Sequence, residues 1–198
     1  MKEVVTAEDL RLLSTPDAEI IEKSQQEWSF DCDECRSRIK DGERWQHLLL
    51  AHIYLEHVMA QILKDAIPFP DEISFSRMPF SQRLDLARAL DLLPPDLVSA
   101  IRRITKMRNQ VAHSLSFSIG DSEVKDLENC SPQGLRTAIE EDVSRTSHKI
   151  ELFELLEAVV IMTEIFRQRH LSQRLLARKA QIRLRTVLDK TPGARYVE

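Results

Sequence analysis

The sequence has little glycine and cysteine and no β-rich runs between its helix-like segments. It contains 4 glycines and 3 cysteines in 198 residues, whereas 42% of its residues are hydrophobic, enough to build a core. Parallel sheets need β-rich runs between helices, so their absence favours an all-helical chain. The odd number of cysteines suggests a reducing compartment. The composition therefore predicts an all-α protein, and we expect a cytoplasmic one.

Long apolar runs are also absent. No stretch is long enough to span a bilayer, and Met1-Lys2-Glu3 leads directly into an acidic amphipathic segment rather than a signal peptide. The net charge of −4 indicates no particular partner. Its distribution is more informative, because the region 121–164 is acidic and the region from 165 onward is basic.

The periodicity divides the chain into three regions. We predict an N-terminal helical extension over 1–42, a helical bundle over 43–167 and a basic C-terminal helix and tail over 168–198. Within these regions, helices are predicted over 6–13, from Thr15-Pro16 onward, over 43–66, 82–92, 95–115, 147–167 and 171–188, with residues 189–198 frayed. Residues 116–147 have weak periodicity and are predicted to form an acidic connection.

The segment from Lys106 to Leu115 closes a helix whose apolar positions step by threes and fours. These positions are Leu97, Ile101, Ile104, Val111 and Leu115. The same stepping requires one more core-facing position between Ile104 and Val111, and we assign Arg108 to this position. A core-facing guanidinium keeps its charge, so it needs a carboxylate, a phosphate or water. Asn109 and His113 share a neighbouring face. A site is therefore predicted at this helix end.

The helix predicted over 43–66 carries an acid within its apolar stripe. The stripe consists of Leu49, Ile53, Glu56, Ala60 and Leu63. Because Glu56 interrupts one stripe as Arg108 interrupts the other, we predict a salt bridge between them within one subunit. His52, one turn earlier, is expected to be structural. A purely structural alternative remains open, in which this pair fixes helix register and His113 caps the last carbonyls.

We expect no cofactor and no metal. Cys32 and Cys35 have the spacing of a zinc half-site or a redox pair, but zinc needs further ligands, which Cys130 and a histidine would have to supply from far away. His52 and His57 are five residues apart, whereas helical metal ligands on one face are four apart. We therefore interpret the cysteine pair as two small residues on a helix.

The run Arg108-Asn109-Gln110-Val111-Ala112-His113 resembles the R-x4-H motif of the HEPN domains (higher eukaryotes and prokaryotes nucleotide-binding). A longer run, from Phe80-Ser81-Gln82-Arg83-Leu84-Asp85-Leu86-Ala87 through the motif to Leu115-Ser116-Phe117 and Glu123-Val124, is similar to the branch related to the mannitol operon repressor. The resemblance covers roughly residues 45 to 167.

The resemblance implies an antiparallel helical bundle that forms a homodimer, with two motifs facing one cleft. It implies a metal-independent endoribonuclease, in which a 2′-hydroxyl attacks the adjacent phosphate and leaves a cyclic phosphate and a 5′-hydroxyl. His113 would be the general acid or base, Arg108 would bind phosphate, Asn109 would hold His113 or the ligand, and Glu56 would support the site. Such a protein would be a toxin or a phage-defence effector with an RNA substrate and an antitoxin or regulatory partner. The alternative is a non-catalytic regulator that acts through protein contacts.

Geometry favours a dimer as well. On an ideal helix, Arg108 and His113 project about 140° apart, so a compact site needs motifs from two chains or a distorted helix end. The helix predicted to begin at Ser147 is apolar around most of its circumference, which one bundle cannot fully cover. We therefore predict a homodimer formed through residues 97–115 and 148–167.

The basic tail offers a second place for RNA. Arg167, Arg174, Arg178 and Arg185 follow one another at spacings of seven, four and seven, so they share one side of a helix. Such a row can track phosphates without reading sequence, because no aromatic residues lie among them. The alternative is that these arginines pair with the acidic region 121–164.

Overall fold

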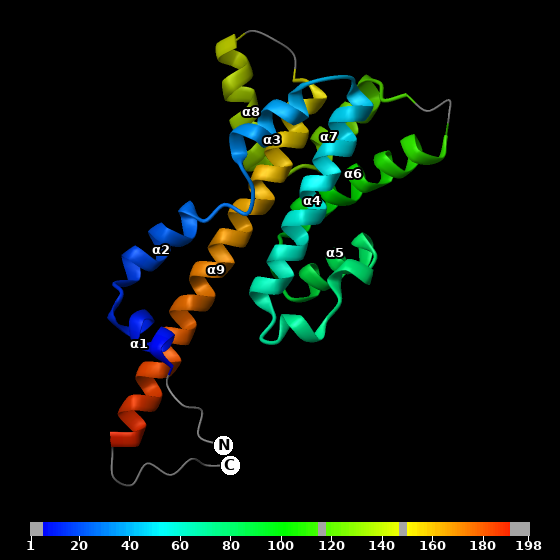
Figure 1. Ribbon diagram of the computed structural model, residues 1–198. Helices are drawn as coiled ribbons and strands as arrows, with labels where there is room; N and C mark the ends of the chain where they lie inside the picture. The colour runs from blue at the N-terminus through cyan, green and yellow to red at the C-terminus, as the bar shows by residue number, and fades with distance from the viewer. Residues whose placement is uncertain (1–5, 115–117, 147–149, 191–198) are drawn as a thin grey trace. The chain divides into compact units, whose positions relative to one another are not determined.

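Every element of the computed structural model is helical (Figure 1). The structure describes residues 6–114, 118–146 and 150–190, and these contain no strand. This confirms the prediction of an all-α protein. The helices are α1 (Ala7–Ser14), α2 (Asp17–Gln26), α3 (Cys32–Lys40), α4 (Arg44–Ala66), α5 (Phe80–Ala89), α6 (Pro95–His113), α7 (Asp121–Cys130), α8 (Gln133–Thr146) and α9 (Leu152–Lys190), with short 3-10 helices η1 (Pro70–Glu72) and η2 (Phe75–Arg77). None of the helices in the described ranges is long and apolar enough to cross a membrane.

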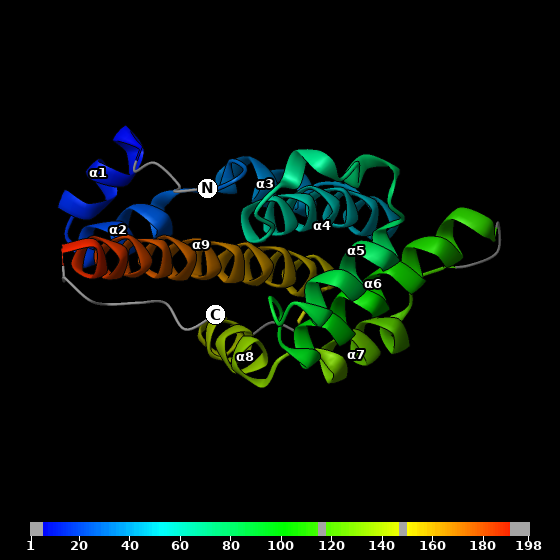
Figure 2. The ribbon, with the colours of Figure 1, turned by 90° about the horizontal axis from the view of Figure 1, so that it is seen from below.

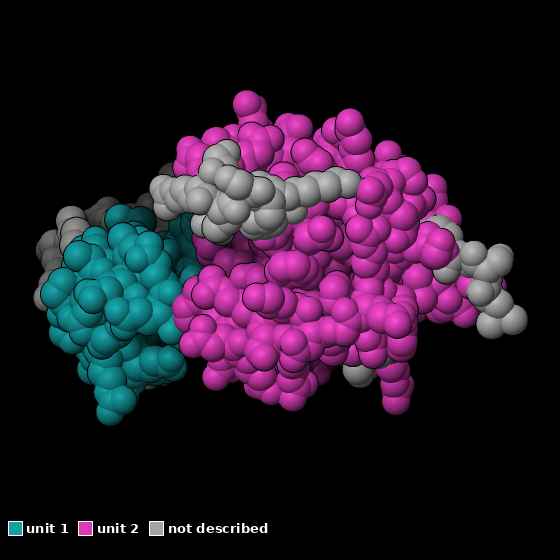
Figure 3. Space-filling view, turned by 90° about the horizontal axis from the view of Figure 1, so that it is seen from above, with its two compact units in different colours: residues 1–27, 168–198 teal, residues 28–167 magenta. Residues whose placement is uncertain are grey.

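Helix α9 runs without a break from Leu152 into the basic segment predicted to be helical over 171–188, as both ribbon views show (Figures 1 and 2). The chain divides into two compact units (Figure 3), and residues of α9 belong to both of them. Unit 1 contains residues 1–27 and 168–198, and unit 2 contains residues 28–167. The units meet at 27/28 and at 167/168, whereas the regions drawn from the sequence met at 42/43 on the N-terminal side. The reason is α3, which buries Cys35 and Ile39 completely in the core of unit 2.

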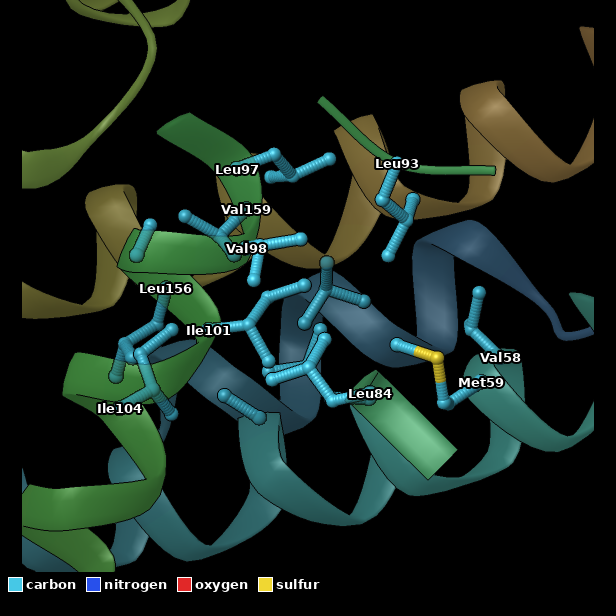
Figure 4. Close-up of a cluster of buried hydrophobic side chains, with 14 of the residues drawn as sticks. Val58, Met59, Leu84, Leu93, Leu97, Val98, Ile101, Ile104, Leu156 and Val159 are labelled. Carbon is cyan, nitrogen blue, oxygen red and sulfur yellow. The ribbon is translucent and has the colours of Figure 1, made fainter. Parts of the chain in front are cut away.

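The core of unit 2 is built around α4, which packs against α3, α5 and α6. Figure 4 shows side chains of α6, among them Ile101 and Ile104, meeting Leu156 and Val159 of α9. All four of these side chains are fully buried. Burying one such aliphatic side chain contributes about 1.5–3 kcal/mol, so this layer fixes the position of α6 in its unit.

The region between α6 and α9 corrects one prediction. Residues 116–147 were expected to be an irregular connection, but they contain α7 and α8. Helix α7 begins after Gly120, whose N–H donates to the Glu123 carboxylate at 3.0 Å, and it buries Val124 and Leu127. A helix of ten residues gives few turns over which to recognise the apolar period. The predicted start at Ser147 lies outside the described residues, as does the fraying expected over 191–198.

Unit 1 pairs the N-terminal helices with the C-terminal part of α9. The predicted Thr6 cap of α1 is confirmed, with Thr6 and Asp9 bonded to each other's backbone. Arg178 of α9 binds the Asp9 carboxylate at 2.8 Å, and Lys179 binds Asp17 and the carbonyl of Thr15. Two N-terminal carboxylates, those of Asp9 and Asp17, thus form ion pairs with Arg178 and Lys179.

Candidate functional site at the end of α6

Helix α6 brings the predicted motif to the surface of unit 2. It starts at Pro95, whose fixed φ suits a first helical position, and remains α-helical to His113. Ser114 then takes an extended conformation, and its N–H donates to the Gln110 carbonyl at 3.0 Å. The helix end is therefore not distorted in a way that would bring Arg108 toward His113.

The core stripe of α6 differs from the prediction at one position. Ile104 is fully buried as expected, but the next buried side chain is Met107, which has no exposed surface. A step of three from Ile104 to Met107 and a step of four to Val111 already complete the helical period. Arg108 is only half-buried on the flank of this stripe, so its assignment to a core position was wrong.

The predicted salt bridge between Glu56 and Arg108 is also wrong. Among the described residues, Glu56 pairs with His52 (Oε1 to Nδ1, 3.3 Å) and with Arg83 (Oε2 to Nη2, 3.8 Å). Arg108 instead donates from Nη1 to the Asn109 Oδ1 at 3.2 Å. The Glu56 side chain is 41% exposed, so water solvates the carboxylate and no desolvated pair forms. The large destabilisation expected of a buried pair does not apply to this residue.

Around Glu56 the structure assembles a polar cluster from three helices, which we call the His52 cluster: His52, Glu56, Phe80, Arg83 and Arg108. The His52 ring lies 4.8 Å from the Phe80 ring, and the Arg83 guanidinium lies 5.6 Å from the same ring. His52 is 4% exposed, and its Nε2 is buried without a hydrogen-bond partner. Burial lowers the pKa of His52, Glu56 opposes this, and the charges of Arg108 and Arg83 lower the pKa further. Both burial and the charge of Arg108 thus favour the neutral form of the His52 imidazole.

His113 lies outside this cluster. It is exposed and contributes to two neighbouring cavities that share it and Ser114. The first, which we call the Lys106 trough, is lined by Arg102, Thr105, Lys106, Asn109, Gln110, His113 and Ser114. The second, the Trp45 cavity, has a volume of about 510 Å³. It is lined by Glu43, Arg44, Trp45, Val111, Ala112, His113, Ser114, Ser118 and Ile119.

The structure therefore joins some of the predicted residues and separates others. Asn109 and His113 line one trough, as their four-residue spacing predicted. Arg108 belongs to the His52 cluster, and five residues of regular helix turn it about 140° away from His113. Arg108 is not among the described residues that line either of the two cavities at His113.

The tail arginines divide into two groups. Arg167 is 4% exposed and binds Asp65 and Glu164 at 2.8 and 2.9 Å, so its assignment to RNA binding was wrong. Arg174, Arg178 and Arg185 are exposed, but Arg178 is engaged by Asp9. The periodic spacing gave no information about the carboxylates that bind Arg167 and Arg178.

The cysteine pair lies in the first turn of α3. Cys35 is completely buried, and burial raises the pKa of its thiol to about 12. A thiol with this pKa is protonated and is a poor metal ligand or nucleophile at neutral pH. Within the described ranges, no group of three or more His, Cys, Asp or Glu side chains is placed to hold a metal ion.

Three residues near the motif were not predicted as site residues. Lys106 lies three and seven residues before Asn109 and His113, so its spacing was a usable signal. Arg83 is part of the run from Phe80 to Ala87, but only its contact with Glu56 gives it a place in the site. Trp45 is far from the motif in the sequence, and no local pattern connects it with His113. Comparisons with protein-family models, with curated proteins and with solved structures gave no match.

Proposed function

We propose that the protein is a metal-independent endoribonuclease of the HEPN type that acts as a homodimer. The observation that carries this proposal is the exposed His113 at the end of α6, which shares its trough with Lys106 and Asn109. A cation, an amide and an imidazole on one open face match the needs of RNA cleavage, namely phosphate binding and proton transfer. The similarity of Arg108–His113 to the R-x4-H motif supports the same reaction.

In this proposal, His113 accepts the proton of a 2′-hydroxyl as its oxygen attacks the adjacent phosphorus. The bond from phosphorus to the 5′-oxygen breaks, and a protonated imidazole returns a proton to that oxygen. The products are a 2′,3′-cyclic phosphate and a 5′-hydroxyl, and no redox partner is needed. Arg108 of the second chain would bind the phosphate, because within one chain Arg108 and His113 point in different directions.

The dimer is supported by the apolar surface of α9. Ile165 is 49% exposed, and Ile161 and Met162 are only partly covered. These side chains line a groove of about 780 Å³ together with residues of α3 and α8. The groove also favours the second candidate function, a non-catalytic HEPN-like regulator that binds a protein partner, since an apolar floor with a charged rim suits a protein surface.

Purified protein is incubated with mixed RNA in excess EDTA to test the proposal. Cleavage should survive chelation, and His113→Ala should reduce its rate about 10²- to 10⁴-fold, the usual contribution of a general acid–base group. His170→Ala is the matched control, because this histidine lies outside the motif and should leave the rate unchanged. New 5′ ends should accept phosphate from polynucleotide kinase without prior phosphatase treatment.

Two results would reject the ribonuclease. One is cleavage of equal rate in wild type and His113→Ala, which would identify a contaminating enzyme. The other is the absence of cleavage of any RNA together with normal growth on overexpression. The second result would favour the regulator.

A further inference from the structure

Trp45 is unusual among the aromatic side chains near the motif because it is both exposed and held in place. Its side chain is 43% exposed, yet its indole Nε1–H donates to the Glu43 carboxylate at 3.0 Å. Large aromatic side chains are mostly buried in cores, where they contribute a large apolar area. A fixed indole at the surface therefore presents a preorganised apolar face to the cavity that it shares with His113.

The two cavities beside His113 differ in charge. In the Lys106 trough, no carboxylate of the described residues pairs with Lys106, so its ammonium group is available to an anion. In the Trp45 cavity, Arg44 is committed to Asp121 at 3.0 Å and to the Ile119 carbonyl at 3.1 Å. Glu43 adds a negative charge there. The trough thus suits a phosphate, whereas the Trp45 cavity suits an uncharged aromatic ring.

We propose that Trp45 is the stacking platform for the nucleobase of the nucleotide whose phosphate lies at His113. The proposal rests on the ribonuclease function proposed above. The trough and the cavity share His113 and Ser114, so the proposal places the phosphate in the trough and the base of the same nucleotide on Trp45. Stacking on an aromatic face accepts every base, so Trp45 contributes affinity and strand position more than sequence preference.

Tryptophan fluorescence tests the contact directly, because the chain contains 2 tryptophans. Trp28→Phe leaves Trp45 as the only reporter, and Trp45→Phe leaves Trp28, which is similarly exposed at 39%. The probe is a 2′-O-methyl-RNA octamer, which lacks the attacking hydroxyl and is not cleaved. An octamer with the same phosphates but without bases is the matched ligand.

The octamer with bases should quench Trp28→Phe and leave the fluorescence of Trp45→Phe unchanged. Fluorescence anisotropy of a labelled octamer should show that Trp45→Ala lowers affinity about 5- to 150-fold, the range measured for loss of one base–aromatic stack. The same variant should bind the base-free octamer as wild type does. Circular dichroism of both Trp45 variants checks that the helices are retained.

Unchanged Trp45 fluorescence at saturating octamer would overturn the stacking proposal, and so would equal affinity of wild type and Trp45→Ala. Either result leaves the ribonuclease standing if His113-dependent cleavage in EDTA is observed. Quenching of Trp45, together with no cleavage of any RNA and normal growth on overexpression, would retain a nucleobase site at Trp45 and reject the ribonuclease. Failure of wild type to bind either octamer would overturn the stacking proposal outright.

Discussion

Replacing Arg167 with methionine should be among the most destabilising single changes in unit 2. The guanidinium is 5% exposed and contacts Glu164, which is completely buried, at 2.9 Å and Asp65, which is 26% exposed, at 2.8 Å. Methionine retains an unbranched apolar stem but removes the charge, leaving the Glu164 carboxylate with hydrogen bonds from Ser29. Breaking a buried ion pair on one side typically costs about 3–5 kcal/mol, because the remaining charge loses its compensation.

Such a loss is large compared with the total stability of a domain, about 5–15 kcal/mol. Urea unfolding followed by tryptophan fluorescence measures it in the relevant unit, because Trp28 and Trp45 both lie within residues 28–167. The matched control is Arg102→Met. Arg102 binds Asp85 at 2.7 Å, a similar distance, but the two side chains are 58% and 63% exposed.

The control should lose less than about 1 kcal/mol, because exposed ion pairs contribute little. If Arg167→Met lost no more than Arg102→Met, water would have to reach Glu164, and the structural role assigned to Arg167 would be wrong. Its availability for RNA would then have to be reconsidered.

Three further outcomes follow from the same contacts. Burial lowers the pKa of His52 below its value in the unfolded chain, so the unfolded state binds the extra proton at acidic pH. As the pH is lowered from about 6.5, the free energy of unfolding should therefore decrease more steeply in wild type than in His52→Leu. Equal slopes would contradict this prediction. Hydrogen bonds from Thr6 and Arg178 lower the pKa of Asp9 from 3.8 to about 2. Protection of the α1 amides from hydrogen exchange should therefore persist above pH 4 and disappear as the pH falls toward 2. In Asp9→Asn, this protection should already be absent at pH 7. Light scattering should give twice the chain mass of 22.9 kDa, and Ile165→Glu should give the single mass; a wild-type monomer at micromolar concentration would refute the dimer.

Local sequence rules predicted the helices with strong local signals. The Thr6 cap, the apolar stretch that became α4 and the proline start of α6 each depend on residues within a few positions of one another. The same rules predicted α5 but misplaced its ends, since it covers Phe80–Ala89 instead of 82–92. Asp91 has a φ of 56° and redirects the chain, so that Leu92 and Leu93 enter the core.

For the candidate site, the sequence determined which chemical groups α6 carries and which of them share a face. Asn109 and His113 line one trough because the helical period places them there. Their partners are set by tertiary packing. Glu56 meets Arg83 instead of Arg108, since Met107 completes the core stripe and turns Arg108 to its flank. Arg167 forms an ion pair with Asp65, which lies more than a hundred positions away in the sequence. Trp45 and His113 line one cavity only through the packing of α4 against α6, because no local period relates residues on two different helices.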